Sequence, residues 1–504
     1  MTQKKHRFIV LGGGTAGLMA ATFLKTYWSE KVDLTLVYDH KNPGIGVGES
    51  LTPAFLNFLN SVNINISDLI IHANATIKLG LKFKNWTGDG THFYHPFTQL
   101  IKEPDTYNYQ LATAIVDSDQ IMFNNEQSNL YDSYYFDNYS VPFSGSNIIG
   151  KYSAHIDATL FARYLEERFK DQFEIVDNVV AGVMKDKRGH ITSLICEDGE
   201  QINGDFFIDA SGFQRVLFKH LENKWHDMKD WLPLDRCIPN PVFKEFTKQP
   251  TCTTSEASED GWILQVPLQN RWGSGYLYSS EFTTDEQAFE SFSKFVGTQY
   301  DKPLNNTSKV LKFDSGYWDK QWVGNCLSLG LSCGFSEPLE ATNIHQVSQQ
   351  LEWFTQVYNF NTQEHDTDNY NEYNKKVFEN IYLFLRFCYC NNKRYNSKFW
   401  NYINNNEPRK VTDIKNKISE EILNHYSLTT STTFNHFNFT IVANGLGLIS
   451  EKRYSKILDN RNVYEFSKRI NQRTEFEKRN LQLRKSVDHL SLINSIKNGL
   501  EINN

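Results

Sequence analysis

A glycine-rich turn between two apolar segments constrains the fold of this chain more than any other feature. Residues 8–11 are continuously apolar, as expected of a buried parallel strand. Residues 12–17 read Gly-Gly-Gly-Thr-Ala-Gly with GxGxxG spacing, and a helical pattern follows over residues 18–27. A second strand is expected over residues 32–38, and Asp39 follows it directly. This order predicts a βαβ unit whose turn binds a dinucleotide.

Each glycine of the motif has its own physical task. Gly12 permits the tight turn, Gly14 lets the backbone approach a pyrophosphate, and Gly17 lets helix and strand pack closely. The helix N-terminus then faces the phosphates with unpaired N–H groups. A glycine-rich turn without a ligand is the alternative interpretation. The ribose contact comes from Asp39 or from backbone groups of the next loop, and the motif alone does not separate NAD from FAD.

Composition excludes several classes of protein. The 504 residues are 40% hydrophobic and carry a net charge of −7, so a nucleic-acid partner is not expected. No apolar run approaches the ~18 residues of a membrane span, and none reads as a signal peptide. The seven cysteines include no CxxC pair, which indicates reduced thiols, a cytoplasmic setting and no metal site.

The period of the apolar residues changes near residue 350. Residues 1–350 alternate strand and helix patterns, and residues 351–504 are mainly helical in period. The length of the chain suggests two or more structural units that share an interface.

A lysine stands in a segment that otherwise reads as one strand, residues 76–86. Lys78 has apolar neighbours, and desolvation favours the neutral amine, which is the nucleophilic form. Glu340 could hold a proton or a hydrogen bond beside it. The ordinary alternatives are an exposed strand lysine and a carboxylate at a helix N-terminus. Together with a flavin site, a buried lysine would indicate oxidation chemistry that is passed to an amine.

Five ordered blocks of the chain resemble the flavin-dependent halogenases of the tryptophan-halogenase family. They are residues 12–17, 44–53, 77–86, 261–267 and 330–340, with a weaker likeness at 386–400 and 445–447. The resemblance implies an α/β flavoprotein. Its FAD-binding βαβ domain with an associated β-sheet would span residues 1–350, and a mainly helical domain covering the substrate would span residues 351–504.

The resemblance also implies a chemistry. In this family reduced FAD and dioxygen oxidise a halide ion to hypohalous acid, and a lysine directs the acid to an electron-rich aromatic ring. The matching lysine is Lys78, and the matching glutamate, Glu340, polarises the halogen donor or takes the ring proton. No second nucleotide fingerprint for NADH appears, so the implied partner is a separate flavin reductase that supplies FADH2. Self-association is left open.

The family's binding positions transfer to this chain by the same blocks. Halide is expected at Thr342 and the backbone of Asn343, and an aromatic substrate at His95, Phe97 and Phe439. The cofactor positions are Gly12, Gly13, Gly14, Thr15, Ala16, Gly17, Asp39, Gly46, Gly48, Ser50, Val180, Leu331 and Ile344. Gly46, Gly48 and Ser50 belong to a loop, here called the strap, that covers the cofactor and links its site to the lysine.

Several positions depart from the family's pattern. Leu264 replaces the second Trp of the WxWxIP signature, which loosens the barrier between substrate and flavin. Ala341 replaces a Ser beside the glutamate, and Asn343 replaces a Gly at the halide site. Phe439 replaces a Trp of the tryptophan-specific members. We therefore expect an indole or phenol other than free tryptophan. As a hypothesis, the altered halide site favours bromide or iodide, which are oxidised more easily than chloride.

Two alternatives to an FADH2-dependent halogenase share the fold. A flavin-dependent aromatic monooxygenase that hydroxylates its substrate has no need of Lys78. A flavin-binding scaffold without catalysis has no use for Lys78 or Glu340, so their presence argues against it.

Overall fold

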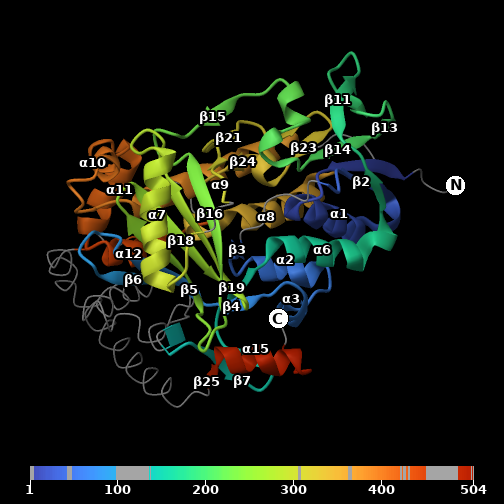
Figure 1. The fold of residues 1–504 in the computed structure, drawn as a ribbon. Helices are drawn as coiled ribbons and strands as arrows, with labels where there is room; N and C mark the ends of the chain where they lie inside the picture. The colour runs from blue at the N-terminus through green and yellow to red at the C-terminus, as the bar shows by residue number, and fades with distance from the viewer. Residues whose placement is uncertain are drawn as a thin grey trace, which may run out of the picture.

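The computed structural model describes residues 5–41, 48–97, 135–136, 138–304, 308–360, 366–420, 423, 427–428, 432–449, 486–500 and 502. Within these ranges the chain has three regions that follow one another across the molecule (Figure 1). A parallel sheet with its helices lies at one side, a mixed sheet lies in the middle, and a group of helices lies at the other side. The predicted α/β class with a mainly helical C-terminal part is confirmed.

A six-stranded sheet carries the predicted βαβ unit. Its neighbouring strands run parallel except for β22 with β23. Phe8 and Val10 of β1 pack against α1, whereas Ile9 and Leu11 pack on the opposite face against the β11-β12-β13 sheet. The strand is apolar at every position because both faces are covered. In sheet order the strands are β10 (Glu174–Asp177), β2 (Val32–Tyr38), β1 (His6–Leu11), β14 (Phe206–Asp209), β23 (Cys326–Ser328) and β22 (Trp322–Val323).

A seven-stranded mixed sheet forms the middle of the molecule. Helix α7 (Asp285–Tyr300) packs on one face through Phe292 and Val296, and α9 (Thr367–Cys388) contributes to the core on the other. Only β5 and β17 run parallel. In sheet order the strands are β20 (Leu311–Lys312), β16 (Arg236–Phe243), β19 (Arg271–Tyr278), β18 (Gly261–Pro267), β17 (Cys252–Ser258), β5 (Gly80–Lys84) and β6 (His92–Pro96).

Smaller sheets and further helices complete the described structure. The small sheets are β3 (Glu49–Ser50), β9 (Ser153–Ile156) and β4 (Thr76–Lys78); β11 (Val180–Lys185), β12 (Ile191–Cys196) and β13 (Gln201–Asn203); β15 (Trp225–Asp227), β21 (Gly316–Trp318) and β24 (Gly334–Phe335); and β25 (Ser486–Asp488), β7 (Ser140–Ser144) and β8 (Asn147–Ile148). The other helices are α1 (Thr15–Trp28), α2 (Phe55–Ser61), α3 (Ile66–His72), α6 (Ala158–Phe169), α8 (Thr342–Val357), α10 (Lys398–Asn405), α11 (Arg409–Glu420), α12 (His436–Gly445) and α15 (His489–Lys497).

The strand expected over residues 76–86 is in fact two strands that belong to different sheets. Strand β4 ends at Lys78 and pairs with β9, and β5 begins at Gly80 and pairs with β17 and β6. Leu79 lies between the two strands. Its N–H donates to Thr251 O at 2.7 Å, and its carbonyl accepts from Phe97 N–H at 2.9 Å. Lys78 therefore lies where the two sheets meet.

Residue 350, the expected division, lies inside α8 (Thr342–Val357). The helix begins directly after Ala341, whose φ of 59° turns the chain. Residue 350 is therefore not an element boundary, because the apolar period of α8 starts well before it. The division into two domains stays a prediction.

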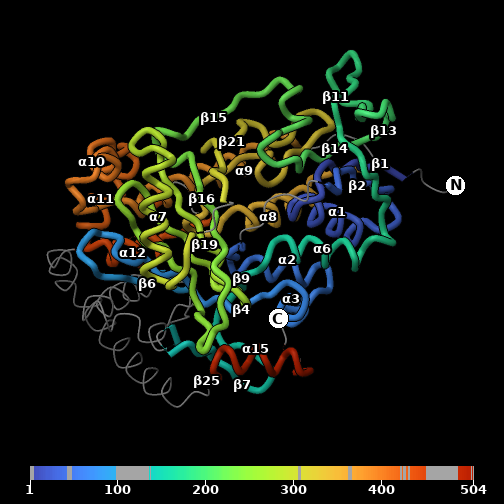
Figure 2. Tube along the Cα trace, viewed as in Figure 1, coloured from blue at the N-terminus to red at the C-terminus, as the bar shows by residue number. Residues whose placement is uncertain are grey.

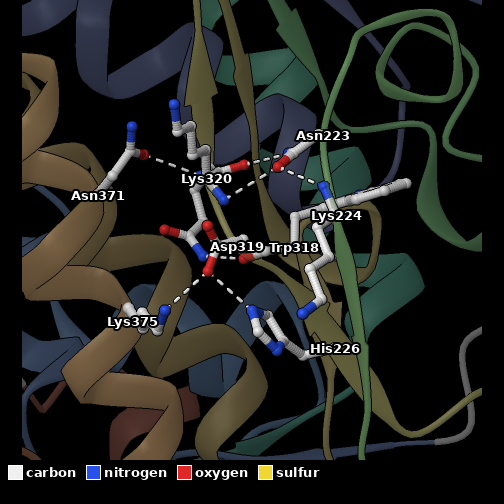
Figure 3. Close-up of polar contacts among 9 residues, drawn as sticks. Asn223, Lys224, His226, Trp318, Asp319, Lys320, Asn371 and Lys375 are labelled. Carbon is white, nitrogen blue, oxygen red and sulfur yellow. Dashed lines mark hydrogen bonds and ion pairs between the residues drawn. The ribbon is translucent and has the colours of Figure 1, made fainter.

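A polar cluster ties α9 to the turn after β21 (Figure 3). The Asp319 carboxylate accepts from Lys375 Nζ of α9 and from His226 Nε2 of β15, both at 2.7 Å. These two partners lower the pKa of Asp319 to about 2. The Asn371 side chain accepts from the backbone N–H of Trp322 at 2.9 Å. The cluster therefore holds the helical region against the parallel-sheet region.

Three further observations concern the class of the protein. None of the helices in the described ranges has the length and apolar character needed to cross a bilayer. All seven cysteines are free, as expected from their spacing. In the same described ranges no three His, Cys, Asp or Glu side chains are grouped as metal ligands.

Candidate active site

The glycine turn joins β1 to α1 with almost no room for side chains. Gly12 has a φ of +124°, and its N–H donates to Val37 O at 2.9 Å. A Cβ on Gly17 would lie 1.8 Å from Gly12 O, and a Cβ on Gly13 would lie 2.2 Å from the Tyr38 ring. These positions need glycine because the protein itself fills the space around them.

Gly14 differs from the other glycines of the turn. Among the described residues, a Cβ at Gly14 would meet no protein atom within 4 Å. Gly14 also caps α1 without any side-chain hydrogen bond to the first-turn N–H groups. The turn thus presents open space and unpaired donors at the same place, which fits the pyrophosphate of a dinucleotide. Thr15 and Ala16 form the start of α1 beside this space.

Two of the expected cofactor positions, Asp39 and Val180, lie near the end of β2. Asp39 directly follows β2, and its carboxylate accepts from Lys41 N–H at 2.9 Å. Val180 begins β11, two residues after Asn178, whose N–H donates to Tyr38 O at 3.2 Å. Both residues therefore lie near the edge of the sheet where the glycine turn opens, and their contacts with a cofactor stay predictions.

A second segment reaches the same turn from far along the chain. Leu329 N–H donates to Asp209 O at 2.9 Å, next to the end of β14. A Cβ on Gly330 would lie 2.8 Å from the Ala16 side chain. Leu331 follows in a short 3-10 helix, and Ile344 is 8% exposed in the first turn of α8. The structure thus brings together the glycine turn and the Leu331 segment, as the cofactor prediction requires.

The described end of the strap, residues 48–52, lies against Lys78, whose Nζ donates to Leu51 O. Gly46 lies outside the described residues. Gly48 has a φ of +102°, and Ser50 donates to or accepts from the Thr253 hydroxyl at 2.6 Å. Thr52 Oγ1 lies 2.9 Å from His345 Nδ1 in the first turn of α8. The strap is therefore fixed both to the large sheet and to the helix that carries the predicted halide residues.

Lys78 is fully buried at the end of β4. Its Nζ donates to Leu51 O of the strap at 3.0 Å and lies 4.8 Å from the centre of the Phe97 ring. Burial lowers the pKa of Lys78 to about 7, although the charge of Glu340 acts in the opposite direction. Lys78 is therefore desolvated by burial, and both amine and ammonium forms are populated near neutral pH.

Glu340 meets His95 in a buried contact that the sequence did not indicate. His95 Nδ1 lies 2.9 and 3.0 Å from the two carboxylate oxygens of Glu340. On its other side His95 Nε2 lies 3.0 Å from Asn438 Nδ2. The Asn438 side-chain oxygen accepts from Asn435 N–H at 2.9 Å, which fixes the orientation of the amide. Asn438 is then the donor, so neutral His95 carries its proton on Nδ1 and donates it to Glu340.

The residues after Glu340 begin α8. The backbone angles of Ala341 lie in the left-handed region, so the chain changes direction between Glu340 and the helix. The Thr342 hydroxyl is fully buried 3.3 Å from Ser336 Oγ. The side-chain oxygen of Asn343 is buried without a hydrogen-bond partner. Thr342 and Asn343 thus lie together in one helix turn, and their contact with halide stays a prediction.

Glu337 is a second buried carboxyl group that sequence analysis missed. It is 1% exposed and accepts from Tyr389 Oη at 2.5 Å, and its other oxygen has no partner. Burial raises the pKa of Glu337 to about 8, so it is mainly protonated at neutral pH. In the sequence, the signal for Glu337 was its position three residues before Glu340. The fold shows that the two carboxyl groups have different surroundings, since Glu340 contacts His95 and Glu337 contacts Tyr389.

The predicted substrate residues lie in three different settings. Phe97 faces the Lys78 amine. His95 is engaged at both ring nitrogens, with Phe384 5.6 Å from its ring. Phe439 is fully buried between Phe384 and Phe387, with ring centres 5.0 and 5.1 Å away. Contacts of these side chains with a substrate stay predictions.

Fold and site together define a flavoprotein-type oxidoreductase with a second, buried amine–carboxylate site. A family model described as tryptophan halogenase matches residues 7–462. The chain therefore belongs to the tryptophan halogenase family, and it is an FADH2-dependent halogenase.

Individual relatives agree with this assignment. The chain is 30% identical over 423 residues to a 7-chloro-L-tryptophan 6-halogenase, KtzR, of Kutzneria sp. (strain 744), covering 78% of this chain and 80% of the relative. It is 30% identical over 385 residues to the tryptophan 7-halogenase RebH of Lentzea aerocolonigenes, covering 70% and 69%. A solved tryptophan C-6 halogenase (chlorinase) from taromycin biosynthesis superposes with a TM-score of 0.85 at 26% identity, covering 98% of this chain and 100% of that chain.

Proposed function

We propose that this enzyme halogenates an electron-rich indole or phenol with hypohalous acid that Lys78 directs. The observation that carries the proposal is the state of the Lys78 amine. It is fully buried, burial lowers its pKa to about 7, and its Nζ donates to Leu51 O of the strap at 3.0 Å. A buried amine that is partly neutral at neutral pH is suited to receive or orient an electrophile.

The cofactor site would provide the oxidant. When bound, reduced FAD and the halide ion would together supply the electrons that reduce dioxygen, with the halide ion oxidised to hypohalous acid and the second oxygen atom released as water. The glycine turn, Leu331 and Ile344 would hold the cofactor, and a separate flavin reductase would deliver it as FADH2. The strap would link this site to Lys78, because Leu51 O accepts from the lysine while Thr52 Oγ1 lies 2.9 Å from His345 Nδ1 of α8.

Lys78 would orient the acid toward the ring. Its bond to Leu51 O uses one N–H and leaves other positions on nitrogen for the acid. The Phe97 ring shields one side of the amine from water. Fixing an oxidant and a ring at one amine raises the effective concentration of the reacting atoms and selects the ring position.

Glu340 would accept the ring proton. A ring carbon gains the halogen and loses H+ to Glu340, and the hydroxide of the hypohalous acid takes up one proton and leaves as water; release of the Glu340 proton replaces the proton that hydroxide took up, so atoms and electrons balance. His95 donates to both oxygens of Glu340 and thereby holds the carboxylate in one orientation. We assign His95 a positioning role in addition to the substrate contact expected for it.

Halide and substrate choice follow from the departures in sequence. Asn343 adds a side chain in the turn of α8 where the family has Gly, which supports a preference for bromide or iodide. Phe439 lies within an aromatic cluster with Phe384, which supports an indole or phenol other than free tryptophan. Leu264, 8% exposed on β18, favours the second candidate function, hydroxylation, since a smaller side chain leaves the flavin less shielded.

The test replaces the amine and keeps the shape of the side chain. In Lys78→Met, indole and bromide with reduced FAD should give at least about 100-fold less bromoindole by mass spectrometry. Hypobromous acid caught by a 1,3-diketone in solution should persist. Lys82→Met is the matched control, because Lys82 lies on the adjacent strand β5 with its Nζ 5.1 Å from the Tyr94 ring. Undiminished bromoindole from Lys78→Met, or hydroxyindole from the parent enzyme, would refute the proposal.

A further inference from the structure

A C-terminal segment lies against the strand that carries Lys78. It consists of β25 (Ser486–Asp488) and α15 (His489–Lys497), beyond residue 462, where the match to the family model ends. Strand β25 pairs with β7, with Val487 opposite Val141. Figure 2 shows α15 beside β7 and α3, and the apolar Leu492, Ile493 and Ile496 join the same core as α3.

His489 is the first residue of α15 and is fully buried. Its Nε2 accepts from the backbone N–H of Ile77 at 2.9 Å. Its Nδ1 lies 3.1 Å from Gln249 O, a backbone acceptor, so Nδ1 carries the proton. Both ring nitrogens are thus used, and the imidazole bridges two backbone segments that are distant in sequence.

Ile77 is the residue directly before Lys78, and its N–H lies on the open edge of β4. Among the described strands, β4 is the last of its sheet and pairs only with β9. Along the opposite edge, Ile77 N–H bonds His489 and Leu79 N–H bonds Thr251 O at 2.7 Å. Without the imidazole one of the two edge bonds that flank Lys78 would be lost, and a buried N–H would have no partner.

We infer that His489 is a positioning residue for Lys78: its Nε2 fixes the backbone of β4, so that the amine points at the strap and the aromatic substrate. The inference rests on the proposed role of Lys78 in halogen transfer. Because the oxidant is made at the nucleotide site, His489 governs how much of it reaches the ring rather than how fast it forms.

Two conservative variants separate the two ring nitrogens. A Gln side chain at this position has an oxygen at the distance of Nε2 and can still accept from Ile77, whereas Asn is shorter and reaches only the Gln249 side. In His489→Asn we expect bromoindole per hypobromous acid formed to fall about tenfold, because a displaced group loses effective concentration. In His489→Gln the ratio should stay within a factor of about two of the parent enzyme.

The control removes stability without touching β4. Ile496 is 1% exposed on the same helix, in the core shared with α3. Ile496→Ala should lower the melting temperature and leave the product ratio unchanged. The assay uses the full chain with bromide, indole and reduced FAD, and it measures bromoindole together with hypobromous acid trapped by a 1,3-diketone.

The outcomes distinguish this inference from the proposed function. If His489→Asn changes the ratio no more than Ile496→Ala does, or if His489→Gln falls as far as His489→Asn, then His489 has only a structural role. If Lys78→Met itself keeps the normal product ratio, the proposed function fails, whatever the His489 variants do.

Discussion

The glycine turn and the Lys78 site are built in opposite ways. The turn is formed by consecutive residues, and its shape depends on backbone atoms and on the absence of side chains. The Lys78 site depends on side chains from distant segments, since His95 and Glu340 are 245 positions apart and Ile77 and His489 are 412 positions apart. The first site is therefore sensitive to added volume and the second to lost polar groups.

The largest effect is expected where added volume meets the protein itself. In Gly17→Ala the new methyl group would lie 1.8 Å from Gly12 O, so β1 and α1 cannot keep their packing. We expect little folded protein, measured by yield and by circular dichroism. In Gly14→Ala no protein atom lies within 4 Å. That variant should fold with a normal melting temperature but bind FAD at least about tenfold more weakly, measured by flavin fluorescence. Equal behaviour of the two variants would contradict the assignment of Gly14 to the pyrophosphate.

The next effect concerns two glutamates that are three positions apart on one segment. Glu340→Gln removes the proposed base, so bromoindole formation should fall by roughly 100-fold, the usual scale of general acid–base catalysis. Glu337→Gln should change it by no more than about threefold, because a pKa of about 8 means that Glu337 is already neutral at pH 7. The measurement is the initial rate of bromoindole formation at pH 7. A greater loss in Glu337→Gln than in Glu340→Gln would reverse the roles of the two carboxyl groups.

Burial of Lys78 should also cost stability, which gives a third test. Its folded pKa of about 7 is below the ordinary 10.5. Between these pH values the unfolded chain binds more protons than the folded chain, so Lys78 makes stability rise with pH over this window and has no effect on the slope below it. Lys78→Met should remove this contribution and raise the free energy of unfolding at pH 7 by up to about 5 kcal/mol. Urea titrations of Lys78→Met and Lys82→Met at pH 7 and pH 10 would measure it, and an unchanged pH slope in Lys78→Met would show that the amine is not desolvated.

The same contrast explains which features the sequence predicted. The strand Val32–Tyr38 and the helix after the glycine turn follow from local patterns, and both were found where expected. The break at Leu79 was missed because two strands of different sheets are separated by one apolar residue that continues the pattern. Lys78 was singled out from its apolar neighbours, but an exposed strand lysine was an equally ordinary interpretation, and the roles of Lys78 and Glu340 came from resemblance to a family.

The partners of these residues could not be predicted from the sequence. His95 was expected to stack on substrate, yet its hydrogen bond to Glu340 depends on β6 and the start of α8 lying together. The orientation of the His95 ring depends in turn on Asn438 and its cap at Asn435. His489 is further still from the strand that it bonds. Such contacts result from tertiary packing, which leaves no periodic pattern in either segment.

The smallest effect is expected at the predicted halide residues, Thr342 and Asn343, which combine backbone and side-chain groups. Asn343 lies in the first turn of α8 and adds a side chain where the family has Gly. Among the described residues, its side-chain oxygen is buried without a hydrogen-bond partner. In Asn343→Gly the extra group is removed, and we expect the ratio of brominated to chlorinated indole to fall about three- to tenfold in an equimolar halide competition, equivalent to about 0.7–1.4 kcal/mol.

Helix propensity also falls by up to about 1 kcal/mol, so Asn343→Ala serves as the control with a shortened side chain and a normal helix. A change in ratio that occurs in Asn343→Gly and not in Asn343→Ala would assign the effect to the backbone. Equal changes in both variants would assign it to the amide, and a parent enzyme that forms mainly chlorinated indole would refute the bromide or iodide preference.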